Sequence, residues 1–170
     1  MIRYVNPREA DYLLAIFDIK SKGEKPRNME IMKKLNVSKS TASLMLKKLE
    51  RKDLVLKKKG YLELTKKGLT VIYELLWRHG VTELSLSKLG LEPEEACLVS
   101  RRIEMIIPFD VLIRIWEQMN KPLKCPLGIE FPDINNINLS KTYYICGSEK
   151  QCLYGVQAYK VKRFFLKDML

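Results

Sequence analysis

Residues 37–56, VSKSTASLMLKKLERKDLVL, are the stretch that decides the fold. Ser38 can cap a helix here, because its side-chain oxygen can accept a hydrogen bond from a first-turn amide. An apolar face at helical spacing follows, made of Ala42, Met45, Leu46 and Leu49. The start of this helix matches the part of a recognition helix that enters the major groove of DNA, and its candidate contacts are Ser38, Lys39, Ser40, Thr41 and Leu44.

The flanking residues predict a winged helix-turn-helix. Upstream, Asn28 can cap a helix over residues 29–35, and residues 36–37 supply the short turn. Downstream, residues 54–56 and 61–64 are typical of two strands joined by a hairpin. Its basic tip is better explained by phosphate contact than by a solvated turn, and it comprises Lys57, Lys58 and Lys59. The alternative interpretation of the helix within residues 37–56 is an amphipathic surface helix in an unrelated helical bundle.

Positive charge is concentrated in the first half of the chain. The chain carries 31 Lys and Arg against 20 Asp and Glu, a net charge of +11. Residues 1–79 hold 19 basic and 9 acidic residues (net +10), residues 80–138 hold 6 and 9 (net −3), and residues 139–170 hold 6 and 2 (net +4). A positive field over the helix-turn-helix favours double-stranded DNA as a partner.

Length and composition exclude several classes of protein. A chain of 170 residues, 46% of them hydrophobic, fits one or two small domains with a filled core. It has no apolar run of about 18 residues, so we expect no membrane span, and its start lacks an apolar signal region, which predicts a cytoplasmic location. With one histidine, no Gly-rich phosphate loop and no Ser-His-Asp arrangement, we do not expect an enzyme.

The rest of the chain predicts a mainly α protein. Residues with capping or helix-starting chemistry precede each apolar segment, and they are Asn6, Thr65, Glu92 and Pro108. We expect the helix after Thr65 to end near His79 and a separate short helix to cover residues 81–88. Residues 139–146 and 152–166, rich in Tyr, Val, Ile and Phe, are candidates for a strand pair.

These elements predict three parts. They are a winged helix-turn-helix DNA-binding domain over residues 1–78, a helical dimerisation and metal-sensing domain over 79–138, and a C-terminal cysteine-containing segment over 139–170 with strands or mixed α/β structure.

Five segments resemble the diphtheria toxin repressor family, whose members are iron- and manganese-dependent repressors. They are residues 10–13 (ADYL), 37–55, 77–84 (WRHGVTEL), 94–104 and 125–133 (CPLGIEFPD). The resemblance covers about residues 5–135. It implies a homodimer that binds a palindromic operator, with iron(II) or manganese(II) held between the DNA-binding and dimerisation domains. By position, the implied metal ligands are Asp11, His79, Glu83 and Glu104.

The chain departs from the family pattern at two ligand positions. Met105 stands where the family has a histidine, and Arg101 stands where it usually has Cys or Glu. An arginine cannot bind a cation, and a thioether is a weak ligand for iron(II) or manganese(II). Cys97 falls near another ligand position of the family. Two interpretations remain open: metal binding, or an ion pair of Arg101 with Glu104 or Asp11 in place of one metal.

The cysteines suggest a second kind of sensor. Thiolates are the ligands of iron–sulfur clusters, and the candidate ligands of a cluster, most simply 4Fe–4S, are Cys125, Cys146 and Cys152 with Cys97 as a candidate fourth. Zinc, redox-active thiols and thiols without a cofactor are the alternatives.

Together these features predict a dimeric transcriptional repressor that responds to iron status, through an iron–sulfur cluster or through directly bound iron. The alternative is a winged-helix DNA-binding protein without a metal effector, either constitutive or switched by thiol redox chemistry.

Overall fold

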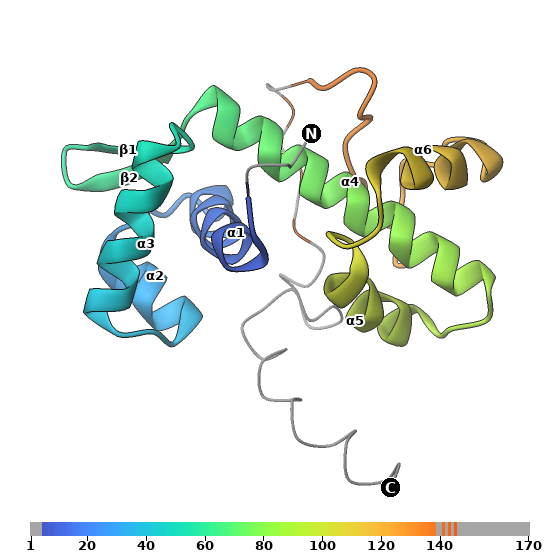
Figure 1. Cartoon of the computed structure of the whole chain (residues 1–170), viewed down its shortest axis with the longest axis horizontal. Helices are drawn as coiled ribbons and strands as arrows, with labels where there is room; N and C mark the ends of the chain where they lie inside the picture. Colours follow the sequence, from blue (N-terminus) through green and yellow to red (C-terminus); the bar gives the residue numbers. More distant parts are fainter. Residues whose placement is uncertain (1–4, 139–140, 142, 144, 146–170) are drawn as a thin grey trace, which may run out of the picture.

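The structure, a computed structural model, describes residues 5–138 together with 141, 143 and 145. It is mainly helical, as the sequence predicts (Figure 1). The element order is α1 (Pro7–Ser21), α2 (Asn28–Leu35), α3 (Lys39–Arg51), β1 (Val55–Lys58), β2 (Tyr61–Leu64), α4 (Lys66–Lys88), α5 (Pro93–Ile103) and α6 (Phe109–Gln118).

Side-chain caps begin three of the helices at the residues that the sequence indicates. The side chain of Asn6 accepts from the N–H of Glu9, and the carboxylate of Glu9 accepts from the N–H of Asn6, each at 2.9 Å. Ser38 caps α3 and Thr65 caps α4 by accepting from backbone amides. Such caps satisfy amides that have no partner inside the helix.

The expected cap of α2 is displaced by one residue. Asn28 is the first residue inside the helix, and Arg27 is the cap. The reason is Glu30, whose carboxylate accepts from the N–H of Arg27 at 3.1 Å and so satisfies the amide that precedes the helix. At the other end Asn36 adopts a left-handed φ of 51° and starts the turn into α3.

The wing is a two-stranded antiparallel hairpin in which Val55 faces Leu64 and Lys58 faces Tyr61. Its two-residue turn is Lys59–Gly60, with φ of 48° and 84°. Positive φ at both positions defines the turn type whose twist matches that of the paired strands. The wing is fixed to the segment before α2, since the N–H of Leu62 donates to the carbonyl of Pro26 at 2.8 Å.

The helix after Thr65 is longer than the sequence predicts. The separate helix expected over residues 81–88 does not exist, because α4 runs unbroken from Lys66 to Lys88. Gly80 stays helical, and its missing side chain makes room for another part of the chain. A Cβ atom added there would lie 2.2 Å from the ring of Phe131.

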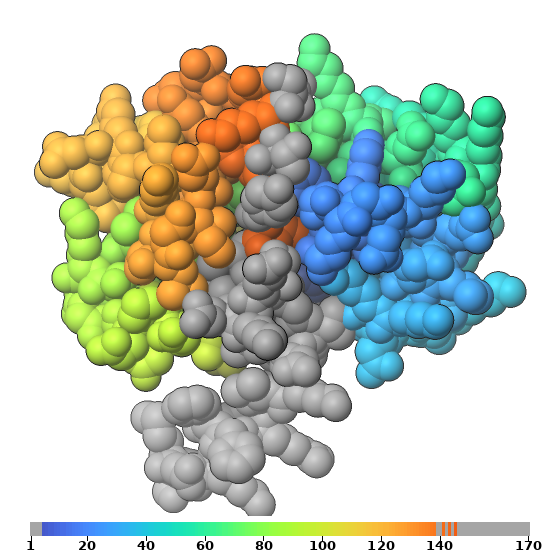
Figure 2. All heavy atoms as spheres, turned by 180° about the vertical axis from the view of Figure 1, so that it is seen from behind, coloured from blue at the N-terminus to red at the C-terminus, as the bar shows by residue number. Residues whose placement is uncertain are grey.

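Two apolar clusters lie along α4. The first joins α1, α2, α3, the wing and the beginning of α4. The second surrounds Trp77, whose ring centroid lies 5.3 Å from that of Phe109 and 5.7 Å from that of Trp116. Seen from behind, the residues of the winged helix and those of α5 and α6 occupy opposite sides of the molecule (Figure 2). Helix α4 is therefore the element that connects the winged helix to the later helices.

The structure does not cover every residue for which the sequence makes a prediction. Cys146, Cys152 and, apart from residues 141, 143 and 145, the strand pair expected over 139–146 and 152–166 lie outside the described residues. The boundary expected between residues 78 and 79 falls inside α4. Among the described helices, none is both long enough and apolar enough to cross a membrane.

Candidate metal centre and nucleic-acid interface

Three buried side chains with metal-binding chemistry meet between α4 and α5. His79 and Glu83 lie one turn apart on α4, with His79 Nε2 3.3 Å from Glu83 Oε2. Cys97 reaches the same point from α5, with its Sγ 3.5 Å from His79 Nε2. One ligand atom of each residue lies within 4.8 Å of those of the other two. Cys97 is disulfide-bonded in this structure, so the arrangement offers a nitrogen, an oxygen and a sulfur atom to one cation once that bond is reduced.

The second nitrogen of His79 is also engaged. Its Nδ1 lies 2.7 Å from Oε2 of Glu104, which is fully buried. Burial alone would lower the pKa of His79, but the carboxylates of Glu104 and Glu83 raise it to about 9. The imidazole is therefore protonated near neutral pH in the absence of a metal, and a cation at Nε2 would replace that proton.

Glu83 is the residue that best fits a bound cation. Its side chain is fully buried, yet within the described part of the chain neither carboxylate oxygen has a hydrogen-bond partner. A buried carboxylate is normally hydrogen-bonded, paired or bound to a metal. Among the described residues, only the 3.3 Å approach of His79 balances the charge of Glu83, so the chemistry of the site suits a divalent cation.

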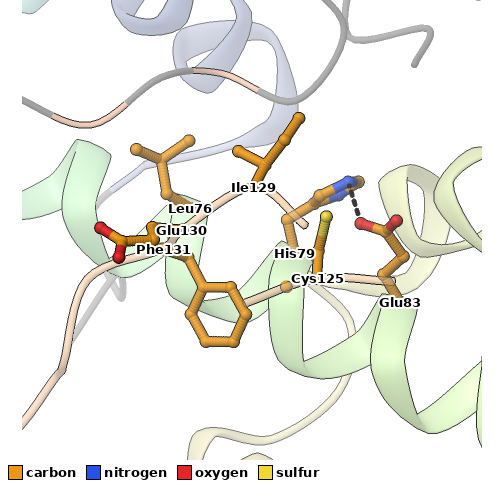
Figure 3. Close-up of a pocket in the computed structure, with 8 residues that line it drawn as sticks. Leu76, His79, Glu83, Cys125, Ile129, Glu130 and Phe131 are labelled. Atoms are coloured by element: carbon orange, nitrogen blue, oxygen red, sulfur yellow. Dashed lines mark ion pairs between the residues drawn. The ribbon is translucent and has the colours of Figure 1, made fainter. Parts of the chain in front are cut away.

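A pocket opens beside this group, lined by Leu76, His79, Gly80, Glu83, Cys125, Ile129, Glu130 and Phe131. The buried Cys125 lies next to His79 and Glu83 (Figure 3). A tight turn places it there. The N–H of Cys125 donates to the backbone carbonyl of Ile129 at 2.9 Å, and the N–H of Gly128 donates to the backbone carbonyl of Cys125 at 2.8 Å. Gly128 adopts a φ of 80° in this turn. The Cys-Pro-x-Gly segment thus places the thiol of Cys125 at the edge of the candidate centre.

Asp11 lies apart from the His79 group. Its carboxylate is paired with Arg101 of α5, and Arg101 also donates to Glu104 Oε1 at 2.8 Å. Of the four ligands that the family resemblance implies, His79 and Glu83 meet together with Cys97. Glu104 contacts both His79 and the guanidinium group of Arg101, and Asp11 contacts that guanidinium group. The ion pair considered from the sequence is the arrangement observed.

Arg78 is a buried residue whose role the sequence does not indicate. Its guanidinium pairs with Glu74 at 3.1 Å and donates to the carbonyls of Glu104 and Ile107 at 3.1 and 3.0 Å. These bonds fix the turn between α5 and α6 against α4. They also fix the backbone of Glu104, which orients the imidazole of His79.

The residues predicted to contact DNA all lie at the surface. The start of α3 and the wing tip are exposed, namely Ser38, Lys39, Ser40, Thr41, Leu44, Lys57, Lys58 and Lys59. Leu44 is 74% exposed, so its side chain is accessible to a partner. Helix α3 thus presents to solvent the side that the sequence predicts to contact DNA.

Two further cations lie beside the wing. Lys25 and Arg27 each lie 4.8 Å from the centre of the Tyr61 ring, and Arg27 also donates to the hydroxyl of Tyr61 at 3.0 Å. They extend the basic wing surface. Folding of the chain brings Lys25 and Arg27 to Tyr61, because α2 and α3 lie between them and Tyr61 in the sequence.

The fold is that of a winged-helix regulator with an added helical domain, and sequence comparison gives the family. The model of the iron dependent repressor N-terminal DNA binding domain matches residues 6–69. The model of the iron dependent repressor metal binding and dimerisation domain matches residues 65–133. The chain belongs to this family of repressors, the diphtheria toxin repressor family, whose members are not enzymes.

Individual relatives agree with this assignment. The iron-dependent repressor IdeR of Mycobacterium tuberculosis is 31% identical over 126 residues, which is 72% of this chain and 54% of the relative. This chain therefore spans about half the length of that relative. An uncharacterized HTH-type transcriptional regulator of Aeropyrum pernix is 29% identical over 142 residues and is covered over 79% of its length.

Solved structures show the same fold. The hypothetical protein SSo2273 from Sulfolobus solfataricus is similar with a TM-score of 0.70 and 31% identity, over 76% of this chain and 100% of that one. The manganese regulator SloR is similar with a TM-score of 0.67 and 30% identity, over 79% of this chain and 64% of that one.

Proposed function

We propose that this protein is a homodimeric transcriptional repressor whose affinity for DNA rises when a divalent metal, in first place iron(II), binds between α4 and α5. The observation that carries the proposal is the buried carboxylate of Glu83, which faces His79 and Cys97 without a hydrogen-bond partner among the described residues. His79, Glu83 and the reduced thiol of Cys97 would hold the metal.

The donor set favours iron over manganese. Manganese(II) prefers oxygen ligands, whereas imidazole and thiolate suit iron(II) and zinc(II) better. When bound, the metal supplies a positive charge that offsets the buried carboxylates. The chain's own contribution is to join α4 to α5, since His79 and Glu83 come from one helix and Cys97 from the other. The relatives include an iron-dependent repressor and a manganese regulator, so both metals belong in the test.

DNA binding is supported by the exposed start of α3 and by the lysines of the wing. Cations at phosphates supply most nonspecific affinity for DNA, and polar side chains at the start of a recognition helix reach base edges. We assign these roles to the wing lysines (Lys57, Lys58 and Lys59) and to the residues from Ser38 to Leu44, respectively.

A homodimer is supported by the matched dimerisation domain and by apolar side chains left partly uncovered in the single chain. Leu112 and Trp116 of α6 are buried within the chain, but Val111 and Ile115 on the same helix are only half-buried. A twofold dimer would present two recognition helices to a palindromic operator. Light scattering that shows a monomer at micromolar concentration, with and without metal, would contradict this part.

An iron–sulfur cluster remains the alternative form of iron sensing. It would use Cys125 with Cys146 and Cys152, and with Cys97 as a candidate fourth ligand. Cys97 and Cys125 both lie at the His79 group, so a cluster and a mononuclear metal would compete for the same thiols. Labile sulfide and a broad visible absorption in anaerobically purified protein would favour the cluster.

The test uses the full chain, purified without oxygen in a reductant. Fluorescence anisotropy would follow its binding to a labelled duplex selected from random DNA, in EDTA and in iron(II) or manganese(II). Iron(II) should raise the DNA affinity of the wild type and leave the DNA affinity of the Glu83→Gln variant unchanged. Glu117→Gln is the matched control, because Glu117 forms an exposed pair with Lys121 and is not one of the three residues of the candidate centre. A wild type that binds DNA equally in EDTA and iron(II), and takes up no iron, would favour the regulator without a metal effector.

A further inference from the structure

One guanidinium group joins the winged helix to the later helices. Arg101 of α5 pairs with Asp11 of α1 and with Glu104, which follows α5. Asp11 belongs to the segment that matches the DNA binding domain, and Arg101 to the segment that matches the metal binding and dimerisation domain. The side chains of Arg101 and Asp11 are 18% and 17% exposed, and that of Glu104 is fully buried. The three charges are therefore largely withdrawn from water.

We propose that Arg101 is a built-in cation that holds α1 to α5 whether or not a metal is bound. Two carboxylates from different parts of the fold converge, and the positive charge that binds both belongs to the protein itself. A guanidinium can donate to two carboxylates at once through its fixed set of N–H groups. This goes beyond the metal response proposed above, because it makes one of the links between the two parts of the chain independent of metal.

The held helix is also the one that positions the recognition helix. Glu9 on α1 is fully buried and forms ion pairs with Lys48 of α3 at 3.0 Å and with Lys52, the residue that ends α3, at 2.8 Å. Glu9 and Asp11 lie two residues apart on α1. Ion pairs thus join α1 to α5 through Asp11 and to α3 through Glu9. Loss of Arg101 would free α1 from α5, and the recognition helix would lose one constraint on its position.

Removal of the guanidinium would have a second consequence. Asp11 and Glu104 would then lose the cation that they share, and the fully buried Glu104 cannot escape into water. Oxygen ligands of this kind suit manganese(II). The variant Arg101→Ala should therefore take up manganese that the wild type does not, and the ion would act as a substitute for the lost side chain.

The first experiment measures DNA affinity in EDTA, where no metal contributes. Arg101→Ala should bind the selected duplex at least about tenfold more weakly than the wild type, which corresponds to about 1.4 kcal/mol. Millimolar manganese(II) should restore most of that loss. Arg102→Ala is the matched control, since Arg102 is the next residue on α5 and is exposed. Arg101→Lys, which keeps the charge, should show a smaller loss and, in a Glu83→Gln background that disables the His79 group, little response of its DNA affinity to manganese.

The second experiment does not require DNA. Isothermal titration with manganese(II), in a background with Glu83→Gln to disable the His79 group, should show one additional equivalent in Arg101→Ala and none with Arg101 present. Adding Asp11→Asn to the Arg101→Ala variant should remove this additional manganese site. Equal DNA affinity of Arg101→Ala and wild type in EDTA, or no manganese uptake by a folded Arg101→Ala, would overturn the proposal. Failure of the His79 group to bind metal would leave both measurements intact, so the two proposals can fail separately.

Discussion

The carboxylate of Glu104 lies between two cationic side chains: its Oε2 is 2.7 Å from Nδ1 of His79, and its Oε1 accepts from Arg101 at 2.8 Å. One fully buried side chain therefore contacts both the candidate metal centre and the ion pair that holds α1. A change of charge at His79 is felt directly by the group that binds Arg101. Metal bound between α4 and α5 would therefore lie next to the ion pair that holds α1, although that pair itself requires no metal.

The first prediction concerns the pKa of His79, the only histidine in the chain. In the metal-free protein its imidazole should titrate near pH 9, and NMR of the single ring can measure this. Since the folded-state pKa is raised, the stabilisation is complete below the unfolded pKa of about 6.5 and is lost as pH rises through about 9. Glu104→Gln should move the pKa down, because it removes the nearer carboxylate charge. An unchanged titration in that variant would show that Glu104 does not set the protonation of His79.

The second prediction concerns the wing. Lys57→Ala, Lys58→Ala and Lys59→Asn combined should weaken binding to all duplexes, where asparagine is chosen because Lys59 has a positive φ. If each lysine contacts one phosphate, the slope of log affinity against log salt should fall by about 0.9 per lysine. A variant with Lys88, Lys124 and Arg102 replaced by alanine removes the same charge from other exposed sites and is the control. The assignment fails if both variants change the slope equally.

The third prediction concerns the contact between Gly80 and Phe131. Gly80→Ala should lower the free energy of unfolding by about 1–3 kcal/mol, as overpacking does, because the new methyl group meets the Phe131 ring. In a Phe131→Ala background the same change should be neutral or stabilising by up to about 1 kcal/mol, since alanine is the better helix former. Chemical denaturation of the four proteins measures the coupling. Equal effects of Gly80→Ala in both backgrounds would rule out the contact.

The winged helix could be predicted because its signals are local. Asn6, Ser38 and Thr65 each cap the helix that follows within three residues, and the alternation of β2 defines the returning strand. The family resemblance added His79 and Glu83 as a pair, and their spacing of one helical turn brings them together. These features depend on neighbours in the sequence, so the sequence alone was sufficient.

The remaining features depend on contacts between distant segments. Gly80 is a helix breaker by propensity, but the ring of Phe131, which fills the space beside it, lies 51 residues further along the chain. The sequence offered an ion pair of Arg101 with Glu104 or Asp11 only as an alternative to metal binding, and that Arg101 pairs with both at once depends on how α5 packs against α1. Likewise, the approach of Arg78 to the carbonyls after α5 follows from packing and has no sequence signature.

The most direct test of the account is the absorption spectrum of the anaerobic, reduced protein titrated with cobalt(II), a spectroscopic substitute for iron(II). We expect one equivalent to bind and to give a near-ultraviolet charge-transfer band from a cysteine thiolate. That band should disappear in Cys97→Ser, and cobalt binding should be lost in His79→Ala and Glu83→Gln. A wild type that binds no cobalt, or a thiolate band that persists unchanged in Cys97→Ser, would contradict a metal centre built from His79, Glu83 and Cys97.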